Sequence, residues 1–540
     1  MSGCTAALEL ADSGKKVDLF VKGRLIEDCN SYLTAGGLTA VPLKNNLPIK
    51  GDSFESHIKD TLEAGKGLND KEVVRFCSRN FYPEVIEWLV KKGVNFDKGD
   101  SKVFEYDLHK EGGHSVNRIF HSKDTTGVEI MNVLGKLVKK HPNITLHEYH
   151  MAIDILTKNK IENKNGEDSC VGFYAYDIKN DYAKTVSCPG IFIATGGLGK
   201  VFMYTSNNDI ATGDGFAICH RIGLELANME FIQFHPTVFY DPKAVDEPQR
   251  RFLLTEALRG AGAIIKSDKD SNEDCILKYS ELGSRATRDV VTRAEDLVMK
   301  EKGIKHLWLD CTKIPGEQMK KDFKNSYEFC IDKGIDPTKE PIPVVYAVHY
   351  SNGGVLVGKN SETKIKGLYV LGEASYTGLH GATRLASNSA PECILFGKLA
   401  AKHFLSIQNT SPGIPLWDLG KATQIKDKEL IDSYWETVRI TMTELCGIAR
   451  DEKRLLLAKK TISSLKKKIN DFYWSYFICK DFLEVRNIAE VAEIIIESAL
   501  SRKESRACHF RQDYPEENQD FLGWTIIEKD KKPVIKPIGE

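Results

Sequence analysis

The sequence predicts an α/β protein: a dinucleotide-binding domain of the Rossmann type, interrupted by an inserted α+β domain and followed by a C-terminal helical bundle. Two apolar runs lead directly into glycine turns, "GIFIATGGLGK" at 190–200 and "IKGLYVLGEAS" at 365–375. Both have the pattern of a buried strand that enters a tight turn, yet they lie far apart, so we expect one domain split by an insertion. Residues 428–505 are rich in Leu, Ile, Lys and Glu at helical spacing, which predicts the bundle.

The remaining elements follow from local patterns. Residues 1–25 predict a helix followed by a strand, residues 52–96 predict helices, and residues 127–150 predict a helix and a strand. The polar, Pro-containing segment "NTSPGIPLWDLG" separates the last domain from the rest. We therefore expect the first part of the dinucleotide-binding domain over 1–229, the inserted domain over 230–342, the second part over 343–408 and the helical domain over 409–540.

Composition excludes several classes of function. The 75 Lys and Arg against 76 Asp and Glu give a net charge of −1, which provides no general attraction for nucleic acid or an anionic membrane. No apolar run approaches the length of a membrane span, and no leader pattern is present, so we expect a cytoplasmic protein. The 13 Cys are scattered without a CxxC motif, which indicates reduced thiols and no metal centre.

Glycine turns indicate a cradle for an elongated cofactor. "SYLTAGGL" at 31–38 and "ATGDGFA" at 211–217 add to the two turns above; each alone is typical of a loop, and the four together favour a cofactor site. A dinucleotide fingerprint is a strand followed by GxGxxG. Gly3 has the place of the third glycine, and neither the strand nor the first two glycines stand before it in this chain.

Polar residues in apolar surroundings predict an anion site. His235 follows two phenylalanines and His349 interrupts an apolar strand; each alone is more typical of a satisfied core histidine. Together with Arg288 and Arg384 they favour capture of an anion, because a guanidinium matches a carboxylate with two hydrogen bonds. This suits a small dicarboxylate. Glu111, in a loop rich in Gly and His, is either a cap or surface carboxylate or a partner for a cationic group.

A set of motifs makes the pattern specific. They are "EGGHSVNRIFH", "TGDG", "NMEFIQFHPT", "TEALRGAGA", "RDVVTRA", "HYSNGGV", "GLYVLGEASYTGLHGATRLASNS" and "RKESRACHFRQDYPE". Together, in order, they resemble the L-aspartate oxidase family of the succinate dehydrogenase and fumarate reductase flavoproteins. The resemblance runs from residue 2 to about residue 520 and implies an FAD-binding domain with a capping domain inserted.

The resemblance implies FAD-dependent oxidation of L-aspartate to iminoaspartate, the first step of de novo NAD biosynthesis, with oxygen or fumarate as electron acceptor. Arg288 would act near Cα as acid, base or transition-state stabiliser, and Glu111 would face the substrate ammonium. His235, His349 and Arg384 would bind the carboxylates, supported by Thr255 and Glu256. A functional link to quinolinate synthase is also implied, and no metal is.

For FAD, the resemblance points to one set of positions. In the covalent succinate dehydrogenase flavoproteins a His stands about six residues before the "GG" turn; here that place is Asn30, so we expect non-covalent FAD. Together with the fingerprint glycine, the expected cofactor residues are Gly3, Lys22, Asn30, Ser31, Gly36, Gly37, Asp214, Glu373, Ser389 and Ala390.

Several positions depart from the family pattern. Ala35 stands where the family usually has Gln, and Thr383 stands where it has Asn. The other departures are Ala261 in place of Glu, Ala390-Pro391 in place of Leu-Leu, and Ala507 in place of Gly. We expect those nearest the flavin and the substrate, Ala35 and Thr383, to affect affinity and rate. Because the first strand and its glycines are not in this chain, we also expect it to bind FAD poorly or to fold marginally. A reading frame that begins too late is the preferred interpretation, ahead of a true N-terminal loss.

Two other functions stay open. One is a soluble fumarate reductase or succinate-oxidising flavoprotein, which would not need Glu111. The other is a non-catalytic truncated remnant that binds a ligand without turnover. The presence of Arg288, Arg384, His235 and His349 together with Glu111 argues against the remnant.

Overall fold

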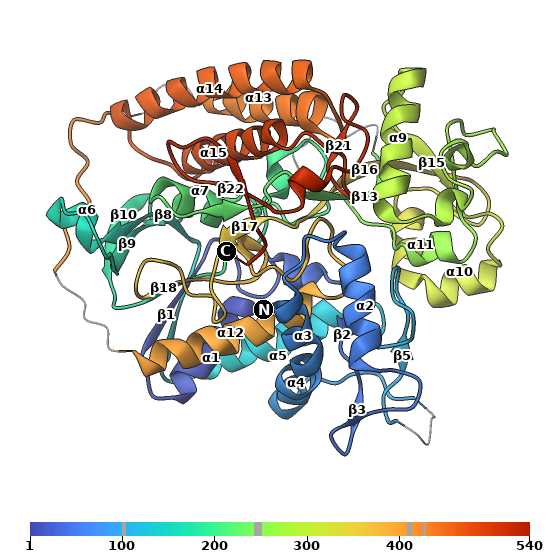
Figure 1. Cartoon of the computed structure of the whole chain (residues 1–540), viewed down its shortest axis with the longest axis horizontal. Helices are drawn as coiled ribbons and strands as arrows, with labels where there is room; N and C mark the ends of the chain where they lie inside the picture. The colour runs from blue at the N-terminus through green and yellow to red at the C-terminus, as the bar shows by residue number, and fades with distance from the viewer. Residues whose placement is uncertain (100–103, 242–250, 408–412, 425–427, 540) are drawn as a thin grey trace.

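Figure 1 shows the computed structural model of the chain, which describes residues 1–99, 104–241, 251–407, 413–424 and 428–539. The dinucleotide-binding part lies at the lower left and centre, the inserted domain lies at the right, and three long C-terminal helices cross the top. This arrangement confirms the predicted fold class, an α/β dinucleotide-binding domain with an α+β insertion and a helical C-terminal part.

The dinucleotide-binding part contains two parallel strand pairs. β1 (Val17–Val21) pairs with β7 (Ile144–Glu148), and β11 (Ile191–Ile193) pairs with β18 (Leu368–Val370). Within the described ranges, no backbone ladder joins one pair to the other. Helix α1 (Ser2–Asp12) contacts β1, β7 and β11, so it packs against strands of both pairs.

Small residues allow α1 to pack closely. Ala6, Ala7 and Ala11 are buried, and alanine has the highest intrinsic helix propensity. The helix packs along α12 (Ser389–Ser406), which follows the second glycine turn. Gly14, at φ 84°, ends α1 by adopting the left-handed conformation that other residues avoid. The chain can therefore turn directly into β1.

The rest of this part is made of helices and three further sheets. Its elements are β2 (Leu38–Thr39), β3 (Leu43–Lys44), β4 (Leu47–Pro48), α2 (Phe54–Ala64), α3 (Lys71–Asn80), α4 (Glu87–Lys92), β5 (Leu108–His109), β6 (Ile119–Phe120), α5 (Thr126–Lys140), β8 (His150–Thr157), α6 (Lys158–Glu162), β9 (Cys170–Asp177), β10 (Tyr182–Ser187) and α7 (Asp214–Arg221). The three sheets have the orders β10-β9-β8, β2-β6-β5 and β3-β4. Apolar side chains of α1, α3, α4, α5 and α12 form one buried cluster.

The inserted domain has its own core and one antiparallel sheet. Its elements are β13 (Ile232–Phe239), α8 (Ala257–Gly260), β14 (Ile264–Lys266), α9 (Arg288–Lys302), β15 (Leu307–Asp310), α10 (Gly316–Asp322), α11 (Lys324–Asp332) and β16 (Ile342–Ser351). The strand order is β13-β16-β15-β14. The register between β13 and β16 shifts on both sides of His235, between Gln233 and Phe234 and again before Val238. Such bulges redirect side chains, and here they flank a predicted site residue.

The C-terminal part combines the predicted helices with strands that return to the main body. Its elements are α13 (Glu429–Cys446), β20 (Ala449–Arg450), α14 (Glu452–Ser475), α15 (Lys480–Ser501), β21 (Phe510–Arg511), β22 (Trp524–Ile527) and β23 (Val534–Lys536). β22 pairs with β12 (Leu226–Ala227), in a sheet that also contains β17 (Gly354–Leu356) and β19 (Ser375–Tyr376). Nearby, Arg502 Nε lies 2.6 Å from Glu230 Oε1 in a fully buried ion pair. The prediction of a helical domain did not include these strands.

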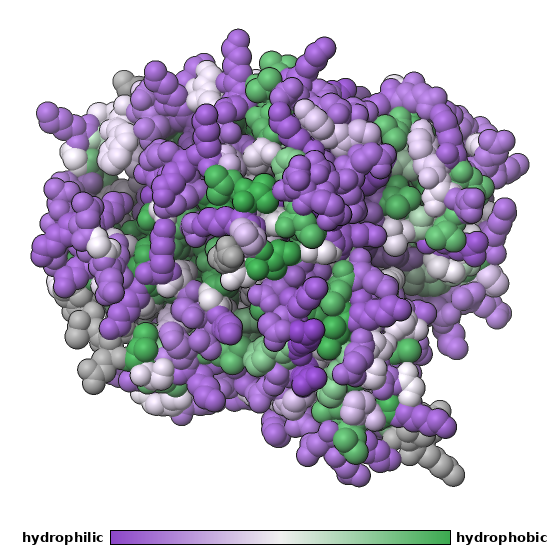
Figure 2. Space-filling view, in the orientation of Figure 1, coloured by the Kyte–Doolittle hydropathy of each residue, from purple (hydrophilic) through white to green (hydrophobic). Residues whose placement is uncertain are grey.

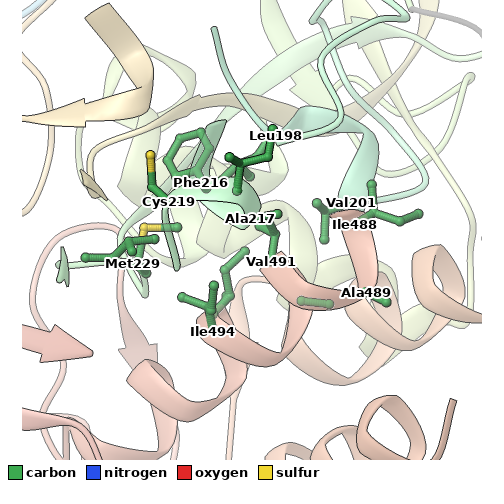
Figure 3. Close-up of a cluster of buried hydrophobic side chains, with 14 of the residues drawn as sticks. Leu198, Val201, Phe216, Ala217, Cys219, Met229, Ile488, Ala489, Val491 and Ile494 are labelled. Atoms are coloured by element: carbon green, nitrogen blue, oxygen red, sulfur yellow. The ribbon is translucent and has the colours of Figure 1, made fainter. Parts of the chain in front are cut away.

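Helix α15 packs against the dinucleotide-binding part through a dry apolar contact (Figure 3). Ile488, Ala489, Val491 and Ile494 of α15 lie in one cluster with Phe216 and Ala217 of α7. All are buried, so this contact is core rather than a domain surface. The contact positions α7, whose first turn lies beside the cavity described below.

The surface is that of an ordinary globular protein. In Figure 2 hydrophilic side chains cover most of the visible face, and hydrophobic ones are scattered among them. Over the described residues, no helix has the length and hydropathy of a membrane span, and no group of His, Cys, Asp and Glu has the arrangement of a metal site. All 13 cysteines are free thiols.

The α15 contact can be tested by truncation. Ile488→Ala removes a fully buried side chain, which costs about 2–5 kcal/mol in a core that cannot collapse around the gap. We expect a lower urea midpoint of unfolding, measured by circular dichroism. The control is Leu456→Ala on the exposed face of α14, where the side chain is 52% exposed and we expect a change within about 0.5 kcal/mol. Equal midpoints for the two variants would show that α15 is not part of the core.

Candidate active site

One continuous cavity of about 1510 Å³ lies between the dinucleotide-binding part and the inserted domain. It is larger than most small-molecule sites, which occupy about 300–1,000 Å³. All the residues that the sequence predicted for catalysis, substrate and cofactor line it: Gly3, Lys22, Asn30, Ser31, Gly36, Gly37, Glu111, Asp214, His235, Thr255, Glu256, Arg288, His349, Glu373, Arg384, Ser389 and Ala390. Residues separated by nearly 390 positions thus share one wall.

Arg384 is held in place on several sides. One of its terminal nitrogens donates to Ser389 Oγ at 3.1 Å, the other donates to Gln233 Oε1 at 3.2 Å, and the guanidinium lies 4.5 Å from the centroid of the Tyr350 ring. Its Nε is buried without a hydrogen-bond partner among the described residues. Burial and the charge of Arg288 lower the pKa of Arg384. A buried guanidinium with an unused N–H is well suited to bind a carboxylate.

Arg288 is the first residue of α9 and pairs with a carboxylate. Its Nε donates to Glu256 Oε2 at 2.5 Å, and Arg259 lies 3.5 Å from the other oxygen of Glu256. Burial lowers the pKa of Arg288, but the charge and hydrogen bond of Glu256 and the charge of Glu111 together outweigh burial, and the net shift is upward. Because the amino end of a helix carries partial positive charge, the position of Arg288 adds to the positive potential of the cavity.

The two histidines face each other from adjacent strands. The rings of His235 on β13 and His349 on β16 lie 5.5 Å apart, and Ser206 Oγ lies 2.9 Å from His349 Nδ1. The backbone amide of Thr237 donates to His235 Nδ1, so the proton of a neutral His235 is on Nε2. Burial, and then the charge of Arg288, hold the pKa of both histidines well below the usual range. Both are therefore neutral donors at neutral pH.

Glu111 is an ionised carboxylate in the same wall. Ser387 donates to its Oε2 at 2.5 Å, and His109 Nε2 lies 3.4 Å from its Oε1. Burial alone raises the pKa of Glu111, but these hydrogen bonds and the nearby charges of His109 and Arg288 lower it overall. A side chain at Gly36 would collide with this carboxylate and displace it from its present position.

Charge in this part of the cavity is unbalanced. Three guanidinium groups, those of Arg259, Arg288 and Arg384, face two ionised carboxylates, Glu111 and Glu256. Buried charges are costly unless they are paired. The arrangement therefore favours an anionic ligand, and Glu111 gives the same ligand a place for one cationic group.

Glycines on the other side form a cradle. A side chain at Gly37 would collide with the carbonyl oxygen of Phe120, and one at Gly197 would collide with the carboxylate of Glu373. The backbone therefore approaches these groups as only glycine allows. Burial raises the pKa of Glu373 to about 7, while the amide of Ser351 donates to it at 3.1 Å.

Two helix ends contribute to the cradle. Ser389 and Ala390 begin α12, and the amino end of a helix attracts negative charge. On α1, a Cβ at Gly3 would lie 3.2 Å from Cβ of Ala194, the close packing expected of the third fingerprint glycine. The amino group of Met1 donates to Ser31 Oγ at 3.1 Å. An elongated cofactor fits this series of glycines and helix ends.

The predicted cofactor residues Lys22 and Asp214 pair with each other. Lys22 Nζ lies 2.8 Å from Asp214 Oδ2 and 2.9 Å from Glu484 Oε1 on α15, and it also donates to Thr212 Oγ1. The pKa of Lys22 is raised, because these carboxylates outweigh burial. Asn30 Oδ1 accepts from the amide of Asn208 at 2.7 Å. These residues therefore connect loops that border the cavity.

Four residues that support the site were not predicted from the sequence. Gln233 contacts Arg384, and Ser206 contacts His349. Ser387 and His109 both contact Glu111. Only His109 carried a local signal, because it stands two residues from Glu111 on the same strand-to-loop segment. The others come from distant parts of the chain, and no spacing rule relates them to their partners.

Thr383 has a clear place in the site. Its Oγ1 accepts from Gln233 Nε2 at 2.9 Å and from Cys508 Sγ at 3.1 Å. Gln233 also accepts a hydrogen bond from Arg384, so Thr383 helps to hold the amide that positions this arginine. The hydroxyl of Thr383 can therefore hold Gln233 in place at a position where the family usually has Asn.

Two family models match the chain. The FAD binding domain matches residues 1–390, and the C-terminal domain of the fumarate reductase flavoprotein matches residues 435–537. The first model alone covers more than half of the chain. FAD is therefore the cofactor of this chain.

Curated relatives and solved structures agree with these matches. The L-aspartate oxidase of Vibrio cholerae is 39% identical over 98% of this chain and 97% of its own, and that of Acinetobacter baylyi is 40% identical over 99% and 94%. An E. coli quinol fumarate reductase subunit superimposes with a TM-score of 0.83 at 26% identity, over 99% of this chain and 94% of its own. The chain belongs to the L-aspartate oxidase family of the succinate dehydrogenase and fumarate reductase flavoproteins.

Proposed function

We propose that this protein catalyses the FAD-dependent oxidation of L-aspartate to iminoaspartate. The observation that carries the proposal is the charge pattern of the cavity: an excess of buried guanidinium groups beside one ionised carboxylate, Glu111. L-Aspartate has two carboxylates and one ammonium group. It therefore satisfies both parts of the pattern, whereas succinate or fumarate leaves Glu111 without a cationic partner.

The carboxylates are bound by groups that the fold already holds in place. Arg384 is fixed by Ser389 and Gln233, so its guanidinium group is held in place before a substrate carboxylate arrives. His235 and His349 remain neutral, so they donate hydrogen bonds without adding charge. Preorganised donors of this kind need little rearrangement when substrate binds, which favours both binding and orientation.

Arg288 and Glu111 act on the amino-acid part of the substrate. FAD, when bound, supplies the hydride acceptor for the oxidation at Cα. Arg288 has a raised pKa and stays protonated, so we assign it to electrostatic stabilisation or proton relay through Glu256 rather than to simple base catalysis. Glu111 stays ionised and orients the ammonium group. Aspartate is thereby held at both ends.

Reduced FAD must pass its electrons on, and oxygen or fumarate is the proposed acceptor. Fumarate has the two carboxylates that the cavity binds, so it can use the substrate site after the product leaves. Non-covalent binding of FAD, the cytoplasmic location and a functional link to quinolinate synthase stay predictions from the sequence.

The first test is reduction of the flavin. Purified protein is loaded with FAD and mixed anaerobically with L-aspartate, and the visible flavin absorbance is recorded. We expect the band to bleach and then to return when fumarate or oxygen is added. D-Aspartate is the control, because its ammonium group points away from Glu111 when both carboxylates are bound. Loaded FAD that L-aspartate does not bleach would contradict the proposed function.

Glu111→Gln separates the two candidate oxidoreductase activities. The change removes the charge that pairs with the ammonium group and nearly preserves shape, so we expect kcat/KM for L-aspartate to fall about 10–100-fold. Fumarate reduction by a reduced dye has no ammonium group and should change less than about threefold. Glu55→Gln on the exposed side of α2 is the matched control. An equal loss in both reactions would favour a fumarate reductase that does not use Glu111 for specificity.

Arg384→Lys tests the carboxylate site. Lysine keeps the charge but cannot bond Ser389, Gln233 and a substrate carboxylate in one plane. We expect KM for L-aspartate to rise about 10–100-fold, with FAD affinity within about threefold of the original. Arg75→Lys on the exposed face of α3 is the control. Unchanged KM in Arg384→Lys would exclude this arginine as a substrate ligand.

A further inference from the structure

Oxidation of L-aspartate releases a proton from nitrogen as well as a hydride from Cα. The nitrogen enters as an ammonium group and leaves as an iminium group with one hydrogen fewer, so a base must take one proton while the hydride goes to FAD. Arg288 stays protonated, and His235 and His349 are weak bases because burial and the charge of Arg288 lower their pKa. This leaves Glu111, the proposed partner of the ammonium group, as the first acceptor.

Glu111 is itself a poor base. Burial raises its pKa, but the hydrogen bonds from His109 and Ser387 and nearby charges lower it overall. A protonated Glu111 therefore passes its proton to a stronger base within hydrogen-bond distance. His109 Nε2 lies 3.4 Å from Glu111 Oε1, and an imidazole is ordinarily more basic than a carboxylate. Transfer from Glu111 to His109 is thus favourable.

The pairing of β5 with β6 holds His109 beside a second histidine. His109 ends β5, and His121 directly follows β6. The centroids of the two rings lie 4.4 Å apart. His121 Nδ1 lies 3.2 Å from Asp97 Oδ2, and its Nε2 lies 3.7 Å from Asp107 Oδ2. These two carboxylates border the histidine pair, so they stabilise a positive charge that arrives on it.

His109 connects the cavity to solvent. It lines the cavity, and its side chain is 39% exposed, against 22% for Glu111 and 11% for His121. Burial, and then the charge of His109, lower the pKa of His121, so His121 stays neutral. A proton taken from Glu111 therefore stays on His109, the more exposed of the two rings, where water can remove it.

We propose that His109 takes up, through Glu111, the proton that the substrate ammonium group loses, and releases it to solvent. This role rests on the proposed oxidation of L-aspartate. The ammonium nitrogen gives one proton to Glu111 as the hydride leaves Cα for FAD. In the tautomer with its hydrogen on Nδ1, His109 presents a bare Nε2 to Glu111 and accepts the proton. The imidazolium then gives a proton to water. His109 acts through Glu111 and does not contact the substrate.

Bleaching of the FAD-loaded protein by L-aspartate in a single anaerobic turnover measures this step. His109→Gln keeps a hydrogen-bond donor for Glu111 but provides no base, so we expect the bleaching rate to fall about 10–100-fold. Fumarate reduction involves no ammonium group and should change less than about threefold. His141→Gln is the matched control, because His141 pairs with Asp12 and does not line the cavity.

A second variant separates proton transfer from a structural role. His109→Ala removes the base and leaves space for a soluble one, so we expect imidazole in the buffer to raise its bleaching rate at least about fivefold without accelerating the original protein. 2-Methyl-L-aspartate has no hydrogen on Cα and binds without being oxidised. Its Kd, measured by calorimetry, should stay within about threefold in both variants.

A bleaching rate of His109→Gln within about threefold of the original would overturn the proposal. So would a His109→Ala variant that imidazole does not accelerate, or a Kd that weakens as much as the rate falls. Failure of the proposed function has a different signature, because L-aspartate would then not bleach even the unaltered protein.

Discussion

The site depends on the cost of burying several guanidinium groups in one cavity. Arg288 and Arg384 each lower the pKa of nearby histidines, and Arg288 also lowers that of Arg384. Glu256 offsets this repulsion only in part, by its contact with Arg288. The remaining positive potential favours an anionic ligand in the cavity. Burial together with that potential keeps the two histidines neutral, and hydrogen bonds together with nearby positive charges keep Glu111 ionised.

Two parts of the fold bring these groups together. His235, Arg288 and His349 belong to the inserted domain or its connecting strands, whereas Glu111, Arg384 and the glycine cradle belong to the dinucleotide-binding part. The large cavity is lined by residues of both parts, with the glycine turns on one side. An interface of this kind excludes water from the reacting atoms when both sides contact the ligand.

Much of the architecture was predictable because its signals are local. The strand-to-glycine patterns at β11 and β18 are each contained in a short segment of sequence. The same holds for the helical period of residues 428–505, which repeats every few residues. The polar site residues stood out because His and Arg interrupt apolar segments. Gln233, Ser206 and Ser387 gave no such signal, since their role comes from partners at least 140 positions away. The return of β22 to pair with β12 was also hidden, because long-range pairing leaves no mark on a short strand.

The sequence by itself determined the fold class, the glycine turns and the identity of the charged groups, because helix period, strand pattern and side-chain chemistry are properties of short segments. Only the tertiary structure decided how these groups act. It set the pKa of Glu111 below that of a carboxyl group in water and that of Glu373 above it, and it paired β22 with β12. Burial, neighbouring charge and strand pairing depend on distances between residues that the order along the chain does not specify.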